Sequence, residues 1–127
     1  MMVHETAAIL VKKGDKILLA KRGHNPWKDT WGIPGGHVKR NESPLQAARR
    51  EAKEELGEVK IGKKLCRHTH SMHIGDIHRC HTFEGEIAGK IRPGDDAKEL
   101  GWFTIRQMKK MNLSPYAIEI INKLFLK

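Results

Sequence analysis

Cysteine is scarce in this sequence, whose 127 residues include only two, Cys66 and Cys80. This number excludes a disulfide-rich secreted domain and provides no CxxC pair, so we expect a reducing, cytoplasmic environment. Long apolar runs are missing as well. The apolar run near the N-terminus, residues 7–11, has five residues, too few for a signal peptide or a membrane span. We therefore expect a protein without membrane contact.

Low-complexity tracts, Gly/Ser-rich or Pro-rich linkers and internal repeats are also absent from the sequence. No domain boundary is therefore indicated. With 39% hydrophobic and 31% charged residues, a chain of this length can bury a sizeable core without disulfides or a structural metal. We predict one domain over residues 1–127, present as a monomer or a homodimer.

Acidic residues are in the minority, with 15 Asp and Glu against 24 Lys and Arg, and the net charge is +9 with histidine neutral. Such a charge favours polyanionic partners, namely nucleotides or nucleic acid. The plainer alternative is a solvated, lysine-rich surface, because net charge governs solubility and steering rather than fold. A nucleotide ligand is therefore expected, and RNA is a second candidate partner.

The first part of the chain is typical of strands and loops. Residues 4–12 and 16–22 are rich in Ile, Leu and Val, and the turn signal Gly14-Asp15 between them predicts a hairpin. Residues 23–40 are rich in Gly, Pro and Asn, a composition that predicts a loop with short extended pieces.

Residues 44–56 carry the clearest helix signal in the sequence. Ser43 is a suitable N-cap, Pro44 fits the first turn, Gln46 completes a capping box, and Gly57 is a C-terminal stop. One face of this helix is apolar at helical spacing, which predicts that it packs on a sheet. The residues of that face are Leu45, Ala48, Ala52 and Leu56.

Strands and helices are predicted to alternate over the rest of the chain. Residues 59–91 indicate several strands with turns at residues 75–76 and 89–90, and residues 102–103 indicate a late strand. This order predicts an α/β fold with a mixed sheet held between helices. Two helices should finish the chain. The first is capped by Thr104 with Gln107 and runs through Met111. The second starts at Ser114 and Pro115, and its apolar face consists of Tyr116, Ile120 and Leu124.

Three carboxylates share one surface of the 44–56 helix. Glu51, Glu54 and Glu55 stand at i, i+3 and i+4, and each like-charge pair at such spacing costs about 0.2–0.5 kcal/mol. A hard divalent cation removes this cost, and Mg²⁺, for which Mn²⁺ can substitute, prefers oxygen ligands and bridges to substrate phosphates. The alternative is a solvated acidic face balanced by neighbouring Arg49, Arg50 and Lys53.

The segment GHVKRNESPLQAARREAKEELGE resembles the Nudix box, Gx5Ex7REUxEExGU with U a bulky apolar residue. The preceding WGIPGG is similar to the usual lead-in of this family. Asn41 stands where glycine is common, and asparagine tolerates a left-handed backbone best among the other residues. Lys39, Ala52 and Glu58 also depart from the pattern, but none replaces a ligand. The motif positions in register are Gly36, Glu42, Arg50, Glu51, Glu54, Glu55 and Gly57.

The resemblance implies a Nudix-type α/β/α sandwich that hydrolyses a diphosphate linkage by metal-assisted attack of water. Glu51, Glu54 and Glu55 would bind Mg²⁺, with the carbonyl of Gly35 as a further ligand. Arg50 would orient the motif carboxylates, Glu42 among them. Family members often add a glutamate from a later loop, here Glu99 or, second, Asp96. The general base stays open between Glu51, Glu54 and Glu99.

Residues around the glycine loop are candidates for binding the rest of the substrate. Besides Gly36, the basic residues Lys21, Arg22 and Lys39 could hold outer phosphates, although ordinary surface positions are equally expected. Trp27, Trp31 and His37 could stack on a nucleobase, although tryptophan more often has a core or rim role.

The substrate itself is less constrained by the sequence. The first strand begins near Val3, which leaves no room for the N-terminal extension of many ADP-ribose hydrolases of the family and favours a MutT-like nucleoside triphosphate pyrophosphohydrolase. ADP-ribose or a nucleotide sugar is the alternative. A nucleotide- or RNA-binding module without turnover is the rival from another class.

A group of histidines and cysteines raises the separate question of zinc. No pair has the CxxC or Hx3H spacing of structural zinc sites, and the alternation in HTHSMH is typical of a strand with one solvated face. Zinc is therefore the less favoured hypothesis for this group, which consists of Cys66, His68, His70, His73, His78, Cys80 and His81.

Overall fold

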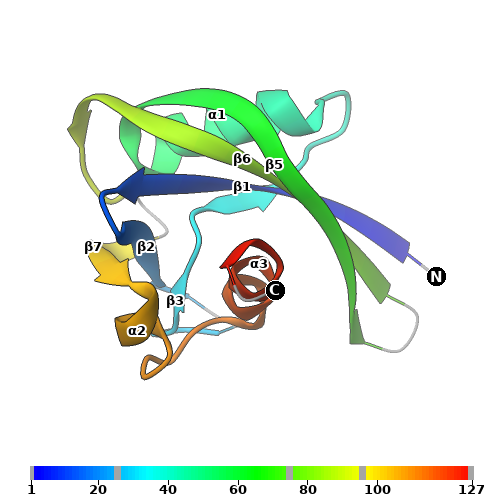
Figure 1. Cartoon of the computed structure of the whole chain (residues 1–127). Helices are drawn as coiled ribbons and strands as arrows, with labels where there is room; N and C mark the ends of the chain where they lie inside the picture. Colours follow the sequence, from blue (N-terminus) through cyan, green and yellow to red (C-terminus); the bar gives the residue numbers. More distant parts are fainter. Residues whose placement is uncertain (1, 25–26, 74–75, 95–96, 126–127) are drawn as a thin grey trace.

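The computed structural model describes residues 2–24, 27–73, 76–94 and 97–125. Its strands form a curved, mixed sheet with helices on either side (Figure 1). The elements are β1 (Met2–Lys13), β2 (Lys16–Arg22), β3 (Trp31–Gly32), β4 (Gly35–His37), α1 (Pro44–Glu55), β5 (Gly57–His73), β6 (Asp76–Ile91), β7 (Ala97–Thr104), α2 (Ile105–Met108) and α3 (Pro115–Phe125).

Strand β1 organises the sheet because it pairs with neighbours on both sides. It runs parallel to β6 from Met2 to Val11, antiparallel to β4, and antiparallel to β2 at Lys12 and Lys13. The main path of the sheet is β3-β2-β1-β6-β5, with β4 attached to β1 and β7 to β2. The β1–β2 hairpin and the mixed sheet predicted from the sequence are both confirmed.

The core lies on both faces of β1, as its continuous apolar run requires. Ile9 and Val11 belong to the cluster under α1, whereas Leu10 belongs to the cluster near α2 and α3. Helix α1 covers one face of the sheet and α3 lies on the opposite face (Figure 1). The predicted α/β sandwich is therefore confirmed, and α1 is fixed on the sheet by its buried residues Ala47, Ala48 and Ala52 and by Leu56, which follows the helix.

Local signals set both ends of α1. The Ser43 side chain accepts a hydrogen bond from the Gln46 N–H, and the Gln46 side chain accepts one from the Ser43 N–H, so the capping box is formed. The helix ends at Glu55 with Leu56 as its C-cap. Gly57 has φ +104°, and a Cβ there would lie 2.8 Å from the Lys90 carbonyl oxygen. Glycine is therefore the residue that lets the chain leave the helix here.

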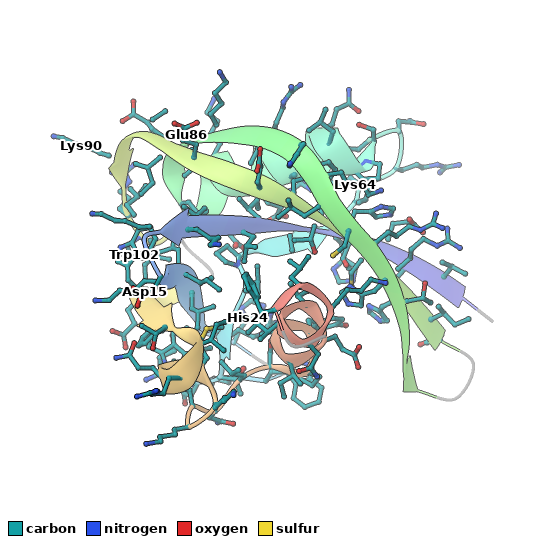
Figure 2. The ribbon with its side chains drawn as sticks, viewed as in Figure 1. Asp15, His24, Lys64, Glu86, Lys90 and Trp102 are labelled. Atoms are coloured by element: carbon teal, nitrogen blue, oxygen red, sulfur yellow. The ribbon has the colours of Figure 1, made fainter. Side chains whose placement is uncertain are left out.

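The strand prediction for residues 59–91 is confirmed, but the number of strands and the turn at residues 89–90 were wrong. The segment forms two long strands, β5 and β6, which remain paired from Ser71 and Ile77 to Gly57 and Ile91 through several register shifts. The predicted turn at residues 89–90 is part of β6, and Lys90 projects from its outer end (Figure 2). Long-range pairing with β5 overrides the local preference of glycine for a turn. The turn predicted at residues 75–76 includes Gly75, which lies outside the described residues.

The C-terminal helices agree with the sequence except in the length of the first. Thr104 and Gln107 form the predicted capping box, but α2 ends at Met108 and tight turns continue to Met111. Helix α3 begins after Ser114, whose side chain accepts a hydrogen bond from the Ala117 N–H. Within the described part of the chain, we find no helix with the length and apolar character needed to span a bilayer.

Leu56 joins α1 to the sheet, and its removal should destabilise the whole domain. It is fully buried in the core under α1. Leu56→Ala should lower the free energy of unfolding by about 2–5 kcal/mol, because a cavity remains where the side chain was. Ile118→Ala, at a position that is 46% exposed, should cost less than about 0.5 kcal/mol. Urea unfolding of both variants measures the difference, and equal losses would contradict this role for Leu56.

Candidate active site

Strand β4 brings two glycines against the carboxylates of α1. The Gly35 N–H donates a hydrogen bond to Glu55 Oε2 at 3.2 Å. A Cβ on Gly36 would collide with the Glu51 carboxylate, and a Cβ on Gly35 would collide with the Ala7 carbonyl of β1. Glycine at position 35 is therefore required for β4 to fit against β1, and glycine at position 36 leaves the Glu51 carboxylate in its place. The fit places backbone groups of β4 beside two of the three predicted metal ligands.

Arg50 lies at the centre of a network of hydrogen bonds around these carboxylates. Its guanidinium binds Glu42 through two bonds, from Nε to Oε2 at 2.8 Å and from Nη2 to Oε1 at 3.0 Å. Nη1 donates to Glu51 at 2.7 Å and to Glu54 at 3.4 Å, and Nη2 also donates to the His37 carbonyl at 2.9 Å. One planar cation thus joins the loop before α1, strand β4 and two carboxylates of α1.

Glu42 fixes Arg50 from the opposite side. Its Oε1 also accepts a hydrogen bond from the Lys39 N–H at 2.9 Å. Asn41, in the same turn, has the left-handed φ of 68° that its place in the motif led us to expect. The hydrogen bond from Arg50, assisted by the Lys39 N–H, lowers the pKa of Glu42 to about 2. The same hydrogen bond raises the pKa of Arg50, so both groups stay charged.

The three carboxylates on α1 differ in their surroundings. Glu51 is buried and held by Arg50, Glu55 is half-buried beside Gly35, and the Glu54 side chain is 55% exposed. Carboxylate oxygens on one helix surface beside a glycine strand fit a hard divalent cation by their chemistry. Among the described residues, however, no three acidic, imidazole or thiol groups converge into a formed ion site. Arg50 already occupies oxygens of Glu51 and Glu54.

The basic and aromatic candidates near the glycine loop are dispersed. Lys39 contributes its backbone to Glu42, while its side chain is exposed. Arg22 ends β2, and Trp27, with a left-handed φ of 66°, is exposed in the following loop. Trp31 packs edge-on against Phe103 at 4.9 Å in the core near α2 and α3. Trp31 is partly buried against this core cluster, which favours the core or rim role over base stacking.

Glu99 lies in a strand, not in the loop where the sequence suggested it. It stands on β7 opposite Lys21 of β2, and its Oε1 lies 3.7 Å from Lys21 Nζ. This ion pair ties both side chains to the β2–β7 ladder, and Lys21 also lies over the Trp31 ring. A catalytic role for Glu99 stays a prediction. Asp96, the second choice, lies outside the described residues.

The histidines considered for zinc are divided between the two faces of the sheet. His78 and His81 are both buried, but His78 Nδ1 lies 2.9 Å from the Tyr116 hydroxyl of α3, whereas His81 Nε2 lies 2.6 Å from Glu5. On β5, His68 is buried while its neighbours Arg67 and Thr69 are exposed. The predicted alternation between a buried and a solvated side is therefore present at residues 67–69. The side chains of His70 and His73 are outside the described part of the structure.

Two side chains that contact His78 were not identified as site candidates from the sequence. His4 stacks on His78 with ring centroids 4.8 Å apart, and both rings lie 6.0 Å from His37. Burial raises the pKa of Tyr116 to about 12, so its hydroxyl stays protonated beside His78. His4 and Tyr116 are more than 100 residues apart in the sequence. A local sequence pattern could not have shown that these two residues lie near each other. They are brought together by the parallel pairing of β1 with β6 and by the packing of α3 against the sheet.

Comparison with known proteins identifies the class to which this fold and site belong. A family model described as the NUDIX domain matches residues 2–124. An ADP-ribose pyrophosphatase of Methanocaldococcus jannaschii is 34% identical over 118 residues, which cover 87% of this chain and 69% of the relative. A CTP pyrophosphohydrolase of Escherichia coli is 33% identical over 90 residues, covering 61% of this chain and 67% of the relative.

Solved structures agree with this result. The crystal structure of a MutT NUDIX hydrolase from Burkholderia pseudomallei superimposes with a TM-score of 0.81 at 25% identity, covering 98% of this chain and 99% of the other. A bifunctional NMN adenylyltransferase/ADP ribose pyrophosphatase from Francisella tularensis, in complex with AMP and a manganese ion, gives 0.75 at 25% identity and covers 98% of this chain but 42% of that one. The chain belongs to the Nudix family. It is a hydrolase acting on phosphoric anhydrides.

The Arg50–Glu42 pair predicts how stability depends on pH. Folding lowers the pKa of Glu42 from 4.5 to about 2. The pair therefore stabilises the fold fully when the pH is above 4.5, the pKa in the unfolded chain, and this stabilisation is lost as the pH falls toward about 2, the pKa in the folded chain. The stability advantage of the wild type over Glu42→Gln should therefore be largest near neutral pH and shrink across this interval. Thermal unfolding at a series of pH values measures it. An advantage that does not change with pH would contradict the pairing, and Glu86→Gln, on an exposed part of β6, is the matched control.

Proposed function

We propose that this chain hydrolyses the diphosphate linkage of nucleoside diphosphate derivatives with the help of Mg²⁺. The observation that carries the proposal is the network in which Arg50, anchored by Glu42, holds Glu51 and Glu54 beside the glycines of β4. Three adjacent carboxylates facing a polyphosphate would repel it without a cation between them. A purely nucleotide-binding role explains such a set of acids less well.

Glu51, Glu54 and Glu55 are the residues that would hold the metal, and Gly35 would contribute its carbonyl. Mn²⁺ is expected to substitute for Mg²⁺, since both accept oxygen ligands. The metal would lower the pKa of a bound water and neutralise charge on the reacting phosphate. The protein would supply the orientation, because Arg50 and Gly35 already fix the carboxylates in place.

The proton acceptor stays open between Glu51, Glu54 and Glu99. Glu51 accepts a short hydrogen bond from Arg50 at 2.7 Å, whereas the contact of Arg50 with Glu54 is longer, at 3.4 Å. Glu99 is paired with Lys21. A carboxylate that is less strongly bound to a cation is the better base, which favours Glu54 over Glu51. Glu99, at 3.7 Å from Lys21, stays an equal candidate.

A nucleoside triphosphate is the substrate that we place first, as the sequence favoured. The similarity to the E. coli CTP pyrophosphohydrolase is consistent with this choice. ADP-ribose is the second candidate, supported by the similarity to the M. jannaschii ADP-ribose pyrophosphatase. RNA as a partner, a cytoplasmic location and the choice between monomer and homodimer stay predictions.

Activity assays with single substitutions test the proposed reaction. The wild type with Mg²⁺ should release products from a panel of nucleoside triphosphates, ADP-ribose and nucleotide sugars, and chelation of the metal should abolish this activity. Glu54→Gln and Glu55→Gln should each lower kcat by about 10²-fold or more, because each removes a proposed ligand of the metal that would stabilise the charge of the transition state.

Glu86→Gln is the matched control for these variants. Glu86 is exposed on β6, where its side chain lies away from β4 (Figure 2), and its substitution should leave kcat unchanged. Chromatographic identification of the products from CTP and from ADP-ribose distinguishes the two substrate candidates. Inactivity of the wild type across the whole panel, with several divalent metals tried, would overturn the proposal.

A further inference from the structure

A polar cavity lies at the C-terminal end of α1, next to the candidate metal ligands. Its volume is about 440 Å³. None of its basic side chains was singled out as a phosphate ligand from the sequence. The cavity is lined by Lys53, Glu54, Gly57, Arg92, Pro93 and Gly94.

Hydrogen bonds fix the wall of this cavity to the end of the helix. The Arg92 N–H donates to the Leu56 carbonyl at 2.9 Å, and the Gly94 N–H donates to the Glu55 carbonyl at 3.0 Å. A Cβ on Gly94 would collide with the Glu54 carbonyl oxygen and lie 2.9 Å from Glu55 Cα. The segment after β6 is therefore held tightly against α1, and the cavity is formed without rearrangement of the backbone.

The side chains around this cavity are charged and exposed. Neither Lys53 nor Arg92 makes an ion pair with another residue in the described part of the chain, and both side chains are exposed. Glu54 lines the same cavity and also contacts Arg50 at 3.4 Å. The cavity therefore includes one carboxylate of the proposed active site, Glu54, and two cations face it, one from α1 and one from the segment after β6.

We propose that Lys53 and Arg92 bind the terminal phosphate of a nucleoside triphosphate, which extends the function proposed above and rests on it. A terminal phosphate carries more charge than an internal one, and Lys and Arg recognise it by charge and by bidentate hydrogen bonding. A substrate that ends in a sugar, such as ADP-ribose, offers no such group. This pair therefore selects for substrates with a free terminal phosphate.

The plain alternative is a stabilising role. Cations near the C-terminus of a helix interact favourably with its dipole, and Lys53 lies in the last turn of α1. A dipole role predicts lower thermal stability on substitution but no change in substrate preference. A phosphate-binding role predicts unchanged thermal stability but a changed substrate preference. Measuring the melting temperature and the substrate preference therefore distinguishes the two roles.

The test uses the full chain with Lys53→Gln, Arg92→Gln and the double variant. For the best triphosphate substrate, each single substitution should raise KM about tenfold, as expected for loss of a charge-assisted hydrogen bond, with kcat nearly unchanged. KM for ADP-ribose should stay the same. Calorimetry with a methylene-bridged triphosphate, which resists hydrolysis, should show the same loss of affinity without any turnover. Lys60→Gln and Arg106→Gln, at exposed positions of β5 and α2, are the matched controls.

The outcomes separate this inference from the proposed function. An active enzyme whose KM for triphosphates does not change in the double variant would overturn the phosphate site alone. An equal rise in KM for ADP-ribose, or a lower melting temperature with unchanged KM, would overturn it as well. A wild-type chain that neither binds the methylene-bridged triphosphate nor hydrolyses any nucleotide would overturn both.

Discussion

The contact of one guanidinium with several carboxylates is the interaction on which the site depends. Glu51, Glu54 and Glu55 repel one another on α1, and Arg50 offsets this by bonding to two of them and to the His37 carbonyl. Glu42 holds Arg50 in that position through two hydrogen bonds. Arg50 bonds to carboxylates of α1 and to the backbone of β4. It therefore both offsets the repulsion between the carboxylates and fixes the distance between these carboxylates and the glycines of β4.

Strand β1 connects this site to the core. Its residues Thr6, Ala7 and Ala8 pair with β4, and the next inward residues, Ile9 and Val11, pack under α1. A shift of β1 would therefore move β4 and disturb the packing of α1 together. The two glycines make this arrangement sterically feasible, since a Cβ on Gly35 would collide with β1 and one on Gly36 with Glu51.

The two ends of the acidic surface of α1 have different surroundings. On the side of β4, backbone groups and Arg50 surround Glu51 and Glu55. At the C-terminal end, Glu54 faces an open cavity with Lys53 and Arg92. Dense hydrogen bonding suits the fixed part of a catalytic site, and an open, positively charged end suits the variable part of a phosphorylated substrate. In the proposed function, the reaction class would therefore depend on the residues beside β4, and the substrate preference on Lys53 at the end of α1 together with Arg92 after β6.

Local interactions explain what the sequence by itself determined. The bounds of α1, its capping box, the turn at Asn41 and the i, i+3, i+4 spacing of the carboxylates all follow from residues close together in the chain. The length of β5 and β6, the core position of Trp31 and the strand position of Glu99 were decided by pairing between distant segments. The cavity beside Glu54 forms only where residues 92–94 return to the end of α1. Helix caps act within one turn, whereas sheet register and cavities depend on which distant segments pack together, and only the tertiary structure decides that.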